Sequence, residues 1–354
     1  MLRISSLSLH NFRSFDAFRL EEAGELTIFV GPNASGKTNA LEAIRLLTAA
    51  SSFRNASPTD LIGISGAEAS ASARIVGDGR ILDVEMISSE GKRHWSLNGK
   101  KRLAKEIRGL LPSVVFTPDD LQIIKGGDRG RRREIDMLGL QINSNYNQIT
   151  KDYEKLLSHK NRLLKDGASE SVLDAVYDVF AIVAEQYSQY RQALFERLMP
   201  ALSKQYSLLA SESGKDRPEK LTGLYARSWD GPTDEALKNA KWEELGSRRT
   251  VIGPHLDKIT LLLDGLDASK FASQGQQRSI MLALKLAEVE TIEQMTGSVP
   301  ILLLDDVMSE LDAQRRSALV DIVLGGSQTF VTTANIDYFD DAMLSAAKII
   351  ELKG

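Results

Sequence analysis

The chain has no cysteine among its 354 residues, so disulfide bridges and thiolate metal sites are excluded. Histidine is scarce, and its four copies are too scattered to indicate a metal site: His10, His94, His159 and His255. Long apolar runs are missing too, since no stretch approaches the ~20 residues that a membrane helix needs. The polar, alternating N-terminal segment is unlike a signal peptide. These absences predict a cytoplasmic protein that does not cross a membrane.

An excess of positive charge is also absent. The formal net charge is -4 at pH 7, which counts against a general attraction to nucleic acid. Any DNA-binding surface must therefore be local. The densest basic cluster comprises Arg129 and the run Arg131, Arg132 and Arg133. It either contacts phosphates or forms an exposed or salt-bridged start of a helix, and the sequence favours neither interpretation.

The pattern of predicted secondary structure changes twice along the chain. Short strand patterns occupy the first 116 residues, and strands alternating with helices return from about residue 259. Between about 131 and 210 glycine is nearly absent, and apolar residues recur at helical spacing; we expect these stripes, which include Val172, Val176, Val179 and Val183, to form core. We therefore predict an α/β fold in which residues 1–116 and 250–354 form one lobe. Residues 117–249 would form an inserted, mainly helical lobe.

A glycine-rich loop follows an apolar run at 26–30 and precedes a helical pattern that begins near Asn39. It matches G-x-x-x-x-G-K-[ST] in full, with the residues Gly31, Pro32, Asn33, Ala34, Ser35, Gly36, Lys37 and Thr38. Glycines let backbone N–H groups converge on phosphates, and the helix N-terminus favours the same anion. Lys37 would reach the β- and γ-phosphates, and the Thr38 hydroxyl would bind Mg²⁺. The loop predicts ATP and Mg²⁺ as ligands.

A second apolar run, 301–304, ends in Asp305 and Asp306. Acids at the carboxyl end of a buried parallel strand emerge where α/β proteins bind ligands. Asp305 would hold Mg²⁺, directly or through water, and Asp306 would orient or deprotonate the attacking water. Two acids capping the next helix would give the same pattern. The presence of the phosphate loop favours the catalytic interpretation.

The segment Ser273-Gln-Gly275-Gln276-Gln-Arg precedes a helical pattern and lies 28 residues before the acidic strand (301 − 273). Alone it would indicate a helix start, because serine is a good N-cap. The order of phosphate loop, serine–glycine signature, acidic strand and the segment 309–312 (SELD) resembles the ABC-type ATPases. The resemblance narrows to the RecF-like family of ABC/SMC-type ATPases. Its supporting segments are 11–15 (NFRSF), 52–54 (SFR), 116–121 (FTPDDL), 131–134 (RRRE), 253–255 (GPH) and 272–288 (ASQGQQRSIMLALKLAE).

The resemblance implies an ABC-type ATPase head, with a mixed sheet and helices, that binds ATP between two copies of the chain. Ser273 of one copy, with Gly275 and Gln276, would complete the site of the other copy by contacting its γ-phosphate. Lys37, Asp306 and Ser273 would then carry the slow hydrolysis of ATP. Arg13 would approach the nucleotide; the less favoured alternative is a solvated arginine.

Members of this family act on DNA, so the resemblance also implies partners. They bind duplex DNA near single-strand gaps in an ATP-dependent way. They act with RecR and RecO, and so help RecA to replace single-strand-binding protein. A nucleoid-associated place in the cytoplasm would follow.

The sequence departs from the expected pattern at several positions. Asp306 stands where most ABC proteins have glutamate, and no glutamine matches the Q-loop near 117–118. No histidine follows 329–333, where Thr332, Thr333 or Asn335 are the candidates to replace it. After 253–255 the chain reads Leu-Asp-Lys in place of Arg-Asp-Asp. A nucleotide-controlled clamp with little catalytic role, or another ABC-type ATPase such as a transporter subunit, remains an alternative. A nucleotide kinase would leave the serine signature unexplained.

Overall fold

The computed structural model describes residues 1–64, 66–211 and 219–353. The chain forms two compact units: Met1–Asp120 with Glu288–Gly354, and Leu121–Ala287. A split α/β unit interrupted by a second unit matches the expected organisation, but the return point lies further along the chain. Residues 250–287 belong to the second unit because β10 (Lys258–Leu263) pairs with β9 (Leu221–Ala226) there.

An antiparallel sheet of six strands, in the order β2-β1-β4-β5-β6-β7, forms one layer of the first unit. Alternate residues of β1, such as Leu7 and Leu9, are buried, which gives the sheet one core face. Asn98 and Gly99 both adopt positive φ in the tight turn that joins β6 to β7, and this residue pair is typical of such turns. The strands are β1 (Arg3–Phe12), β2 (Phe15–Leu20), β4 (Glu68–Gly77), β5 (Arg80–Ser89), β6 (Lys92–Leu97) and β7 (Lys100–Arg102).

A parallel sheet of five strands, in the order β14-β3-β13-β12-β8, forms the second layer. Its inner strands β12 and β13 are buried at every residue, as expected for a sheet that is covered on both faces. Because β13 lies between β3 and β12, the ends of these two strands flank the end of β13. The strands are β3 (Leu26–Val30), β8 (Ser113–Phe116), β12 (Ile301–Asp305), β13 (Thr329–Thr333) and β14 (Ala347–Glu351).

Helix α1 (Lys37–Ala49) contacts strands of both sheets of the first unit, including β12, β13, β4 and β5. This position explains why nearly all of its residues are buried. The remaining helical segments assigned to this unit are η1 (Thr59–Leu61), α2 (Ala104–Ile107), η2 (Pro118–Asp120), η4 (Val307–Ser309), α10 (Ala313–Leu324), η5 (Ile336–Tyr338) and α11 (Asp341–Ala346). The boundary between the units falls within α9 (Gln274–Thr296).

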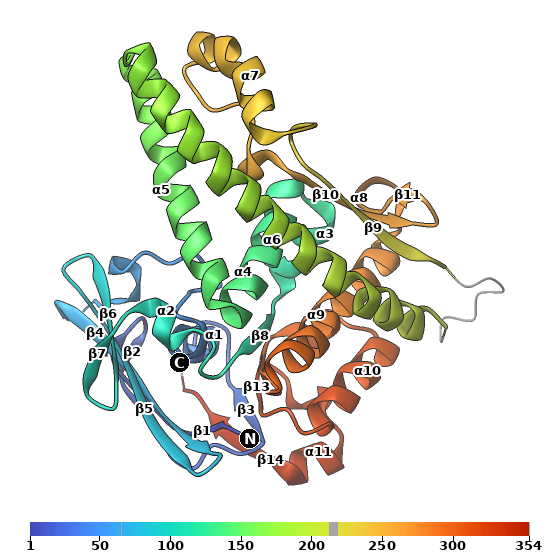
Figure 1. Cartoon of the computed structure of the whole chain (residues 1–354). Helices are drawn as coiled ribbons and strands as arrows, with labels where there is room; N and C mark the ends of the chain where they lie inside the picture. Colours follow the sequence, from blue (N-terminus) through green and yellow to red (C-terminus); the bar gives the residue numbers. More distant parts are fainter. Residues whose placement is uncertain (65, 212–218, 354) are drawn as a thin grey trace. The chain divides into compact units, whose positions relative to one another are not determined.

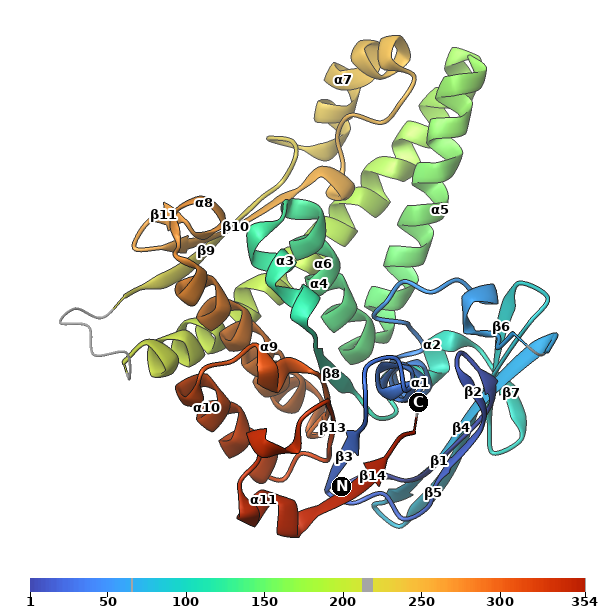
Figure 2. The ribbon, with the colours of Figure 1, turned by 180° about the vertical axis from the view of Figure 1, so that it is seen from behind.

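The second unit is built on two long helices that lie side by side as a hairpin, α5 (Ser144–Asp166) and α6 (Glu170–Ser211) (Figure 1; Figure 2). Gly167 ends α5 in the left-handed conformation, which glycine adopts readily. The other elements are α3 (Leu121–Lys125), α4 (Asp128–Ile142), β9, α7 (Thr233–Ser247), η3 (Pro254–Leu256), β10, β11 (Leu266–Asp267) and α8 (Ala268–Phe271). Among the described helices, none is both long and apolar enough for a membrane span.

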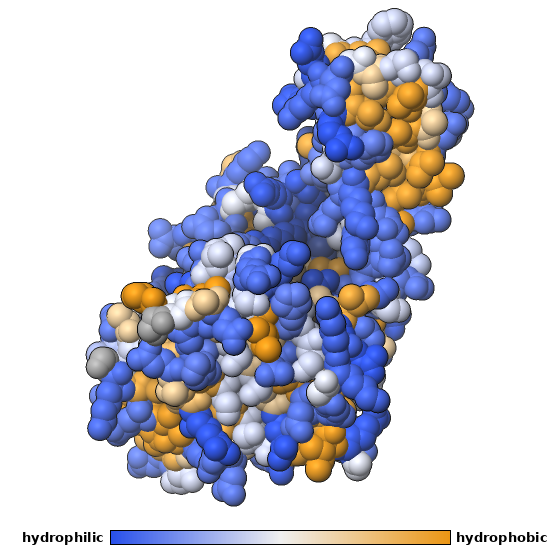
Figure 3. Space-filling model, turned by 90° about the vertical axis from the view of Figure 1, so that its left-hand side faces the viewer, coloured by the Kyte–Doolittle hydropathy of each residue, from blue (hydrophilic) through white to orange (hydrophobic). Residues whose placement is uncertain are grey.

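The expectation that the valine stripe of α6 forms core is wrong for Val172 and Val179, whereas Val176 and Val183 are half-buried. Val172 and Val179 are 46% and 52% exposed, and Ile182 is exposed beside them. Apolar surface gathers at the end of the helical unit, shown in orange at the top of Figure 3. The buried face of α6 instead carries larger side chains, such as Leu173 and Phe180. The helix thus has two apolar faces, and the pattern of hydrophobicity alone does not distinguish the packed one.

Candidate nucleotide-binding site

The glycine-rich loop connects β3 to α1 in the first unit, as the sequence predicts. Lys37, the first residue of α1, is only 7% exposed, and its ammonium donates hydrogen bonds of 2.8 Å to the carbonyls of both Gly31 and Pro32. Asn33 and Ala34 are exposed at the tip of the loop, where Ala34 has a φ of 70°. The lysine charge is therefore held inside the loop by backbone carbonyls.

The start of α1 fits a bound phosphate group. Gly36 precedes the helix with a φ of 93°, and no side chain of the described residues caps its N–H groups. No acidic residue belongs to the first turn of the helix itself, which suits an anion at its N-terminus. The Ser35 hydroxyl is buried and has no hydrogen-bond partner among the described residues. Uncapped donors and a buried orphan hydroxyl are what a phosphate would satisfy.

The glycines are also required by the packing of the loop. A Cβ on Gly31 would lie 2.3 Å from the Leu352 carbonyl oxygen, and one on Gly36 would lie 2.8 Å from the Ser14 hydroxyl. The turn after β1 therefore packs directly against the loop. This places Arg13, in that same turn, beside the candidate site.

Asp305 and Thr38 lie together, although they are far apart in sequence. The Thr38 hydroxyl donates a hydrogen bond of 2.8 Å to Asp305 Oδ1, and the Thr332 hydroxyl donates another of 2.8 Å to the same oxygen. Burial raises the pKa of the Asp305 carboxyl above its ordinary value, and these hydrogen bonds oppose the rise. A buried carboxylate beside a hydroxyl is a donor set that suits Mg²⁺.

Asp306 follows in the left-handed conformation, with a φ of 52°. Its N–H donates to both the hydroxyl and the carbonyl of Thr332, at 3.0 and 3.2 Å. Thr332 thus contacts both acids, whereas the Thr333 hydroxyl donates to the Asn335 carbonyl. Of the three candidates to replace the missing histidine, Thr332 is the one bound to the acidic pair.

Arg13 is paired with an acid that the sequence did not single out. Its Nε and Nη2 donate to the two carboxylate oxygens of Glu42, at 3.0 Å each. Glu42 lies on α1, one turn beyond the phosphate loop, and is completely buried. A bidentate pair of this kind fixes the direction of a guanidinium group. The sequence feature that could have identified Glu42 is its position as a carboxylate on the first helix after a phosphate loop.

Ser273 lies in the second unit, at the start of α9. Its hydroxyl accepts a hydrogen bond from the Gln276 N–H at 3.2 Å, and the Gln276 side chain accepts one from the Ser273 N–H at 2.7 Å. This reciprocal pair is a capping box, and it leaves Ser273 exposed beside Gly275. The signature therefore presents a helix N-terminus at the surface of its unit.

The arginine cluster at 129–133 is largely structural. Arg131 is buried and donates to backbone carbonyls, including that of Gly126 at 2.8 Å, while Arg132 donates to the Asp257 carbonyl. Arg129 and Arg133 are exposed. The interpretation that the whole cluster contacts phosphates is therefore wrong for its central members.

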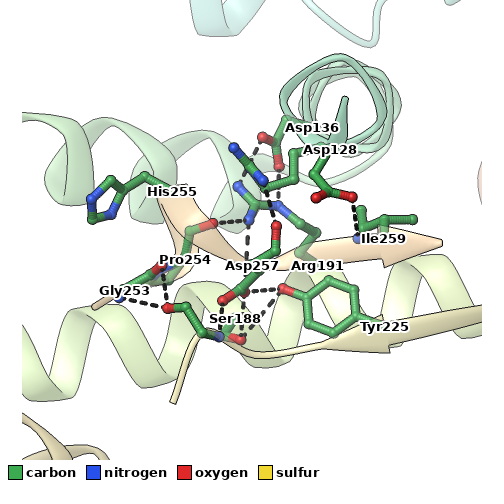
Figure 4. A network of polar contacts seen from close by, with 12 residues as sticks. Asp128, Asp136, Ser188, Arg191, Tyr225, Gly253, Pro254, His255, Asp257 and Ile259 are labelled. Atoms are coloured by element: carbon green, nitrogen blue, oxygen red, sulfur yellow. Dashed lines mark hydrogen bonds and ion pairs between the residues drawn. The ribbon is translucent and has the colours of Figure 1, made fainter. Parts of the chain in front are cut away.

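A polar network around Asp257 holds the segment 253–258 in place within the second unit (Figure 4). The buried Asp257 carboxylate accepts hydrogen bonds from the Ser188 hydroxyl, at 3.1 Å, and from the Tyr225 hydroxyl. Arg191 pairs with Asp136 through two donors and also donates to the Pro254 carbonyl at 2.6 Å. The aspartate at 257 is thus a packing centre of the second unit, whereas the divergent neighbours at 256 and 258 are exposed.

Comparison with known families identifies relatives of this arrangement. The family model described as RecF/RecN/SMC N terminal domain matches residues 3–352. The DNA replication and repair protein RecF of Lactobacillus delbrueckii subsp. bulgaricus is 34% identical over 363 residues, covering 98% of this chain and 94% of its own length. RecF of Gloeobacter violaceus is 33% identical and covers 99% and 96%.

Solved structures show the same relationship. The recombination mediator protein RecF with ATP, from the RecFOR pathway, superposes with a TM-score of 0.88 at 30% identity, covering 96% of this chain and 94% of its own. The Smc head domain of Pyrococcus furiosus, bound to the C-terminal domain of ScpA, has a TM-score of 0.54 at 17% identity, covering 99% and 93%. The second similarity concerns the fold alone, which is that of an ABC-type ATPase head with a helical insertion.

Proposed function

The chain belongs to the RecF family of DNA replication and repair proteins, and we propose that it is a weak ATPase that binds DNA under the control of ATP. The observation that carries the proposal is the meeting of Thr38, from the phosphate loop, with Asp305, from the acidic strand. Their contact produces a site for a nucleotide with its metal ion.

Each residue of the site then has a role. The eight residues of the loop, 31–38, would hold the phosphates through backbone N–H groups, and Lys37 would exchange its two loop carbonyls for phosphate oxygens. Thr38 and Asp305 would hold Mg²⁺, which supplies charge neutralisation for phosphoryl transfer. Asp306 would orient and deprotonate the attacking water.

ATP would also join two copies of the chain. The exposed N-terminus of α9, with Ser273, Gly275 and Gln276, would contact the γ-phosphate bound to the partner's loop. The helix N-terminus adds a favourable dipole for this anion. ADP lacks the shared phosphate and would not hold the two copies together. Two equivalent sites across a two-fold axis would result.

The proposed DNA-binding surface is a basic segment of the first unit, at 92–108. It contains seven lysines and arginines and a single acid, Glu106, in a chain whose net charge is -4. The β6–β7 hairpin forms the edge of the antiparallel sheet, and five of its cations are exposed: Lys92, Lys100, Lys101, Arg102 and Lys105, the last just beyond β7. Such a surface would bind duplex phosphates without reading bases.

The further steps rest on the relatives. One of them is a recombination mediator of the RecFOR pathway. We extend that role to this chain: it would act with RecR and RecO on duplex DNA near single-strand gaps, and so assist RecA. This role would place the protein in the cytoplasm, at the nucleoid.

Fluorescence anisotropy of a labelled, gapped duplex tests the proposal. We expect affinity to rise with ATP but not with ADP, and Lys37→Ala to lose the rise, because no other ammonium of the loop serves the phosphates. ATP turnover that is slow relative to the lifetime of the DNA complex would favour the clamp alternative. In that alternative, hydrolysis only returns the protein to its nucleotide-free, unclamped state. Equal DNA affinity with ATP, with ADP and without nucleotide would contradict both versions.

A further inference from the structure

The side chain of Gln276, in the serine–glycine signature, uses both ends of its amide within the second unit. The amide oxygen accepts the Ser273 N–H at 2.7 Å, and the amide nitrogen donates to Glu219 Oε1, also at 2.7 Å. A backbone N–H only donates and a carboxylate only accepts, so these two partners fix the orientation of the amide. Turning this amide toward a phosphate would break at least one of the two hydrogen bonds.

Glu219, which lies just before β9, is held in turn by the end of α6. The Tyr206 hydroxyl donates to Glu219 Oε2 at 2.6 Å, and Tyr206 is only 1% exposed. Glu219 itself is half-buried. Hydrogen bonds to a carboxylate are stronger than neutral ones, so both partners of Glu219 are firmly placed. A path of hydrogen bonds therefore runs from a core residue of α6 through Glu219 and Gln276 to Ser273.

The path ends at the side chain that would meet the nucleotide of a second copy. The Ser273 hydroxyl accepts the Gln276 N–H at 3.2 Å, a contact that does not use the hydroxyl proton, so this proton can be donated to a phosphate. Ser273 is exposed, and packing therefore contributes little to its position. The hydrogen bonds that fix the segment lower the cost of ordering it when the ligand binds.

We propose that Glu219 is a positioning residue, which fixes Gln276 and through it Ser273 for contact with ATP bound to a second copy of the chain. The inference rests on the proposed function. It also divides the work of the signature: Ser273 and Gly275 would meet the phosphate, whereas the side chain of Gln276 would support them. The phosphate loop belongs to the first unit and Glu219 to the second, so the binding of nucleotide to a single copy would not depend on Glu219.

A swap of the two side chains in the full chain tests this inference. Gln276→Glu keeps the length of the side chain and still accepts the Ser273 N–H, but it places a second carboxylate against Glu219. We expect ATP-induced dimerisation, measured by sedimentation, to weaken by about tenfold, the size of a lost hydrogen bond to a charged group, and turnover to fall with it. Calorimetric titration with ADP, which reports on the phosphate loop alone, should give the wild-type affinity.

Adding Glu219→Gln to Gln276→Glu should restore the dimer. The new amide donates to the new carboxylate, and its oxygen still accepts from the Tyr206 hydroxyl. The matched control is Gln192→Glu, because Gln192 donates to Glu196 at 2.8 Å in a similar pair at the exposed surface of α6. This control should dimerise with ATP as the wild type does.

A double-mutant cycle with Ser273→Ala separates positioning from a general loss of stability. If the path acts through Ser273, Gln276→Glu should weaken the dimer less in the Ser273→Ala background than in the wild type. An equal effect in both backgrounds, or wild-type dimerisation in Gln276→Glu, would overturn the inference alone. A wild-type chain that binds ATP without forming a dimer would overturn the proposed function and this inference with it, so the two failures are distinguishable.

Discussion

The Thr38 hydroxyl and the Asp305 carboxylate share a hydrogen bond of 2.8 Å across 267 residues of sequence. Thr38 belongs to the first helix after the phosphate loop, and Asp305 ends a strand near the other terminus. The parallel sheet brings them together because β13 is the single strand between β3 and β12. Thr332, at the end of β13, completes the contact. In the sequence, the second unit is inserted between the segments that carry these two residues.

Removing the second acid should separate binding from hydrolysis. Asp306→Asn keeps the size of the side chain, but an amide cannot take a proton from water as a carboxylate does. We expect ATP affinity to stay near that of the wild type and turnover to fall by about a hundredfold. Phosphate release and nucleotide titration together measure the two effects. Unchanged turnover would show that Asp306 does not act on the water.

The basic hairpin should carry the salt-dependent part of DNA binding. Replacing Lys100, Lys101 and Arg102 by glutamine should weaken binding to duplexes of any sequence. It should also reduce the slope of log affinity against log salt by about one for each phosphate contact that is lost. Arg129→Gln with Arg133→Gln, which removes two cations at exposed positions of the other unit, provides a control. A slope that changes only in the control would assign the DNA surface to the arginine cluster instead.

His255 should make the second unit sensitive to acid. Burial lowers the pKa of this imidazole to about 4, and a hydrogen bond with the Thr250 backbone opposes the shift. The ordinary pKa is about 6.5, so between pH 6.5 and 4 the unfolded chain binds a proton that the folded chain does not. The free energy of unfolding should therefore fall as the pH decreases through this window.

Urea unfolding of the wild type and of His255→Gln, at pH 7, 5.5 and 4, checks the effect. The stability that the wild type has over the variant should shrink as the pH falls, because only the wild type loses the contribution of a neutral imidazole. A stability difference that stays constant over this range would contradict the assignment of the buried histidine.

Much of the site could be predicted because its motifs are local. The spacing of the loop, the apolar strand before Asp305 and the helix after Ser273 each occupy a few consecutive residues. Contacts that join distant segments were not predictable in this way. The pairing of Glu42 with Arg13 requires the turn after β1 to pack on α1, and only the folded chain shows this.

The predictions for the valines of α6 and for the arginine cluster were wrong for the same physical reason. In both cases the spacing of residues along the sequence does not determine which side chains are buried. The valines of α6 have core spacing, yet Val179 faces outward because larger residues such as Phe180 fill the other face. Arg131 belongs to a basic run, yet it is buried because backbone carbonyls of its own unit accept its hydrogen bonds. The basic segment at 92–108 was not singled out, although Lys100, Lys101 and Arg102 are consecutive in the sequence.

The central claim is that Ser273 completes the site of a second copy, and mixing two inactive variants tests it most directly. Ser273→Arg blocks the signature and Lys37→Ala disables the loop, so each variant alone should lack turnover. In a mixed pair, one site carries both lesions and the other carries none. Random pairing at equal amounts makes half of the pairs mixed, so turnover should return to about a quarter of the wild-type value. A mixture that stays inactive at every ratio would contradict the account.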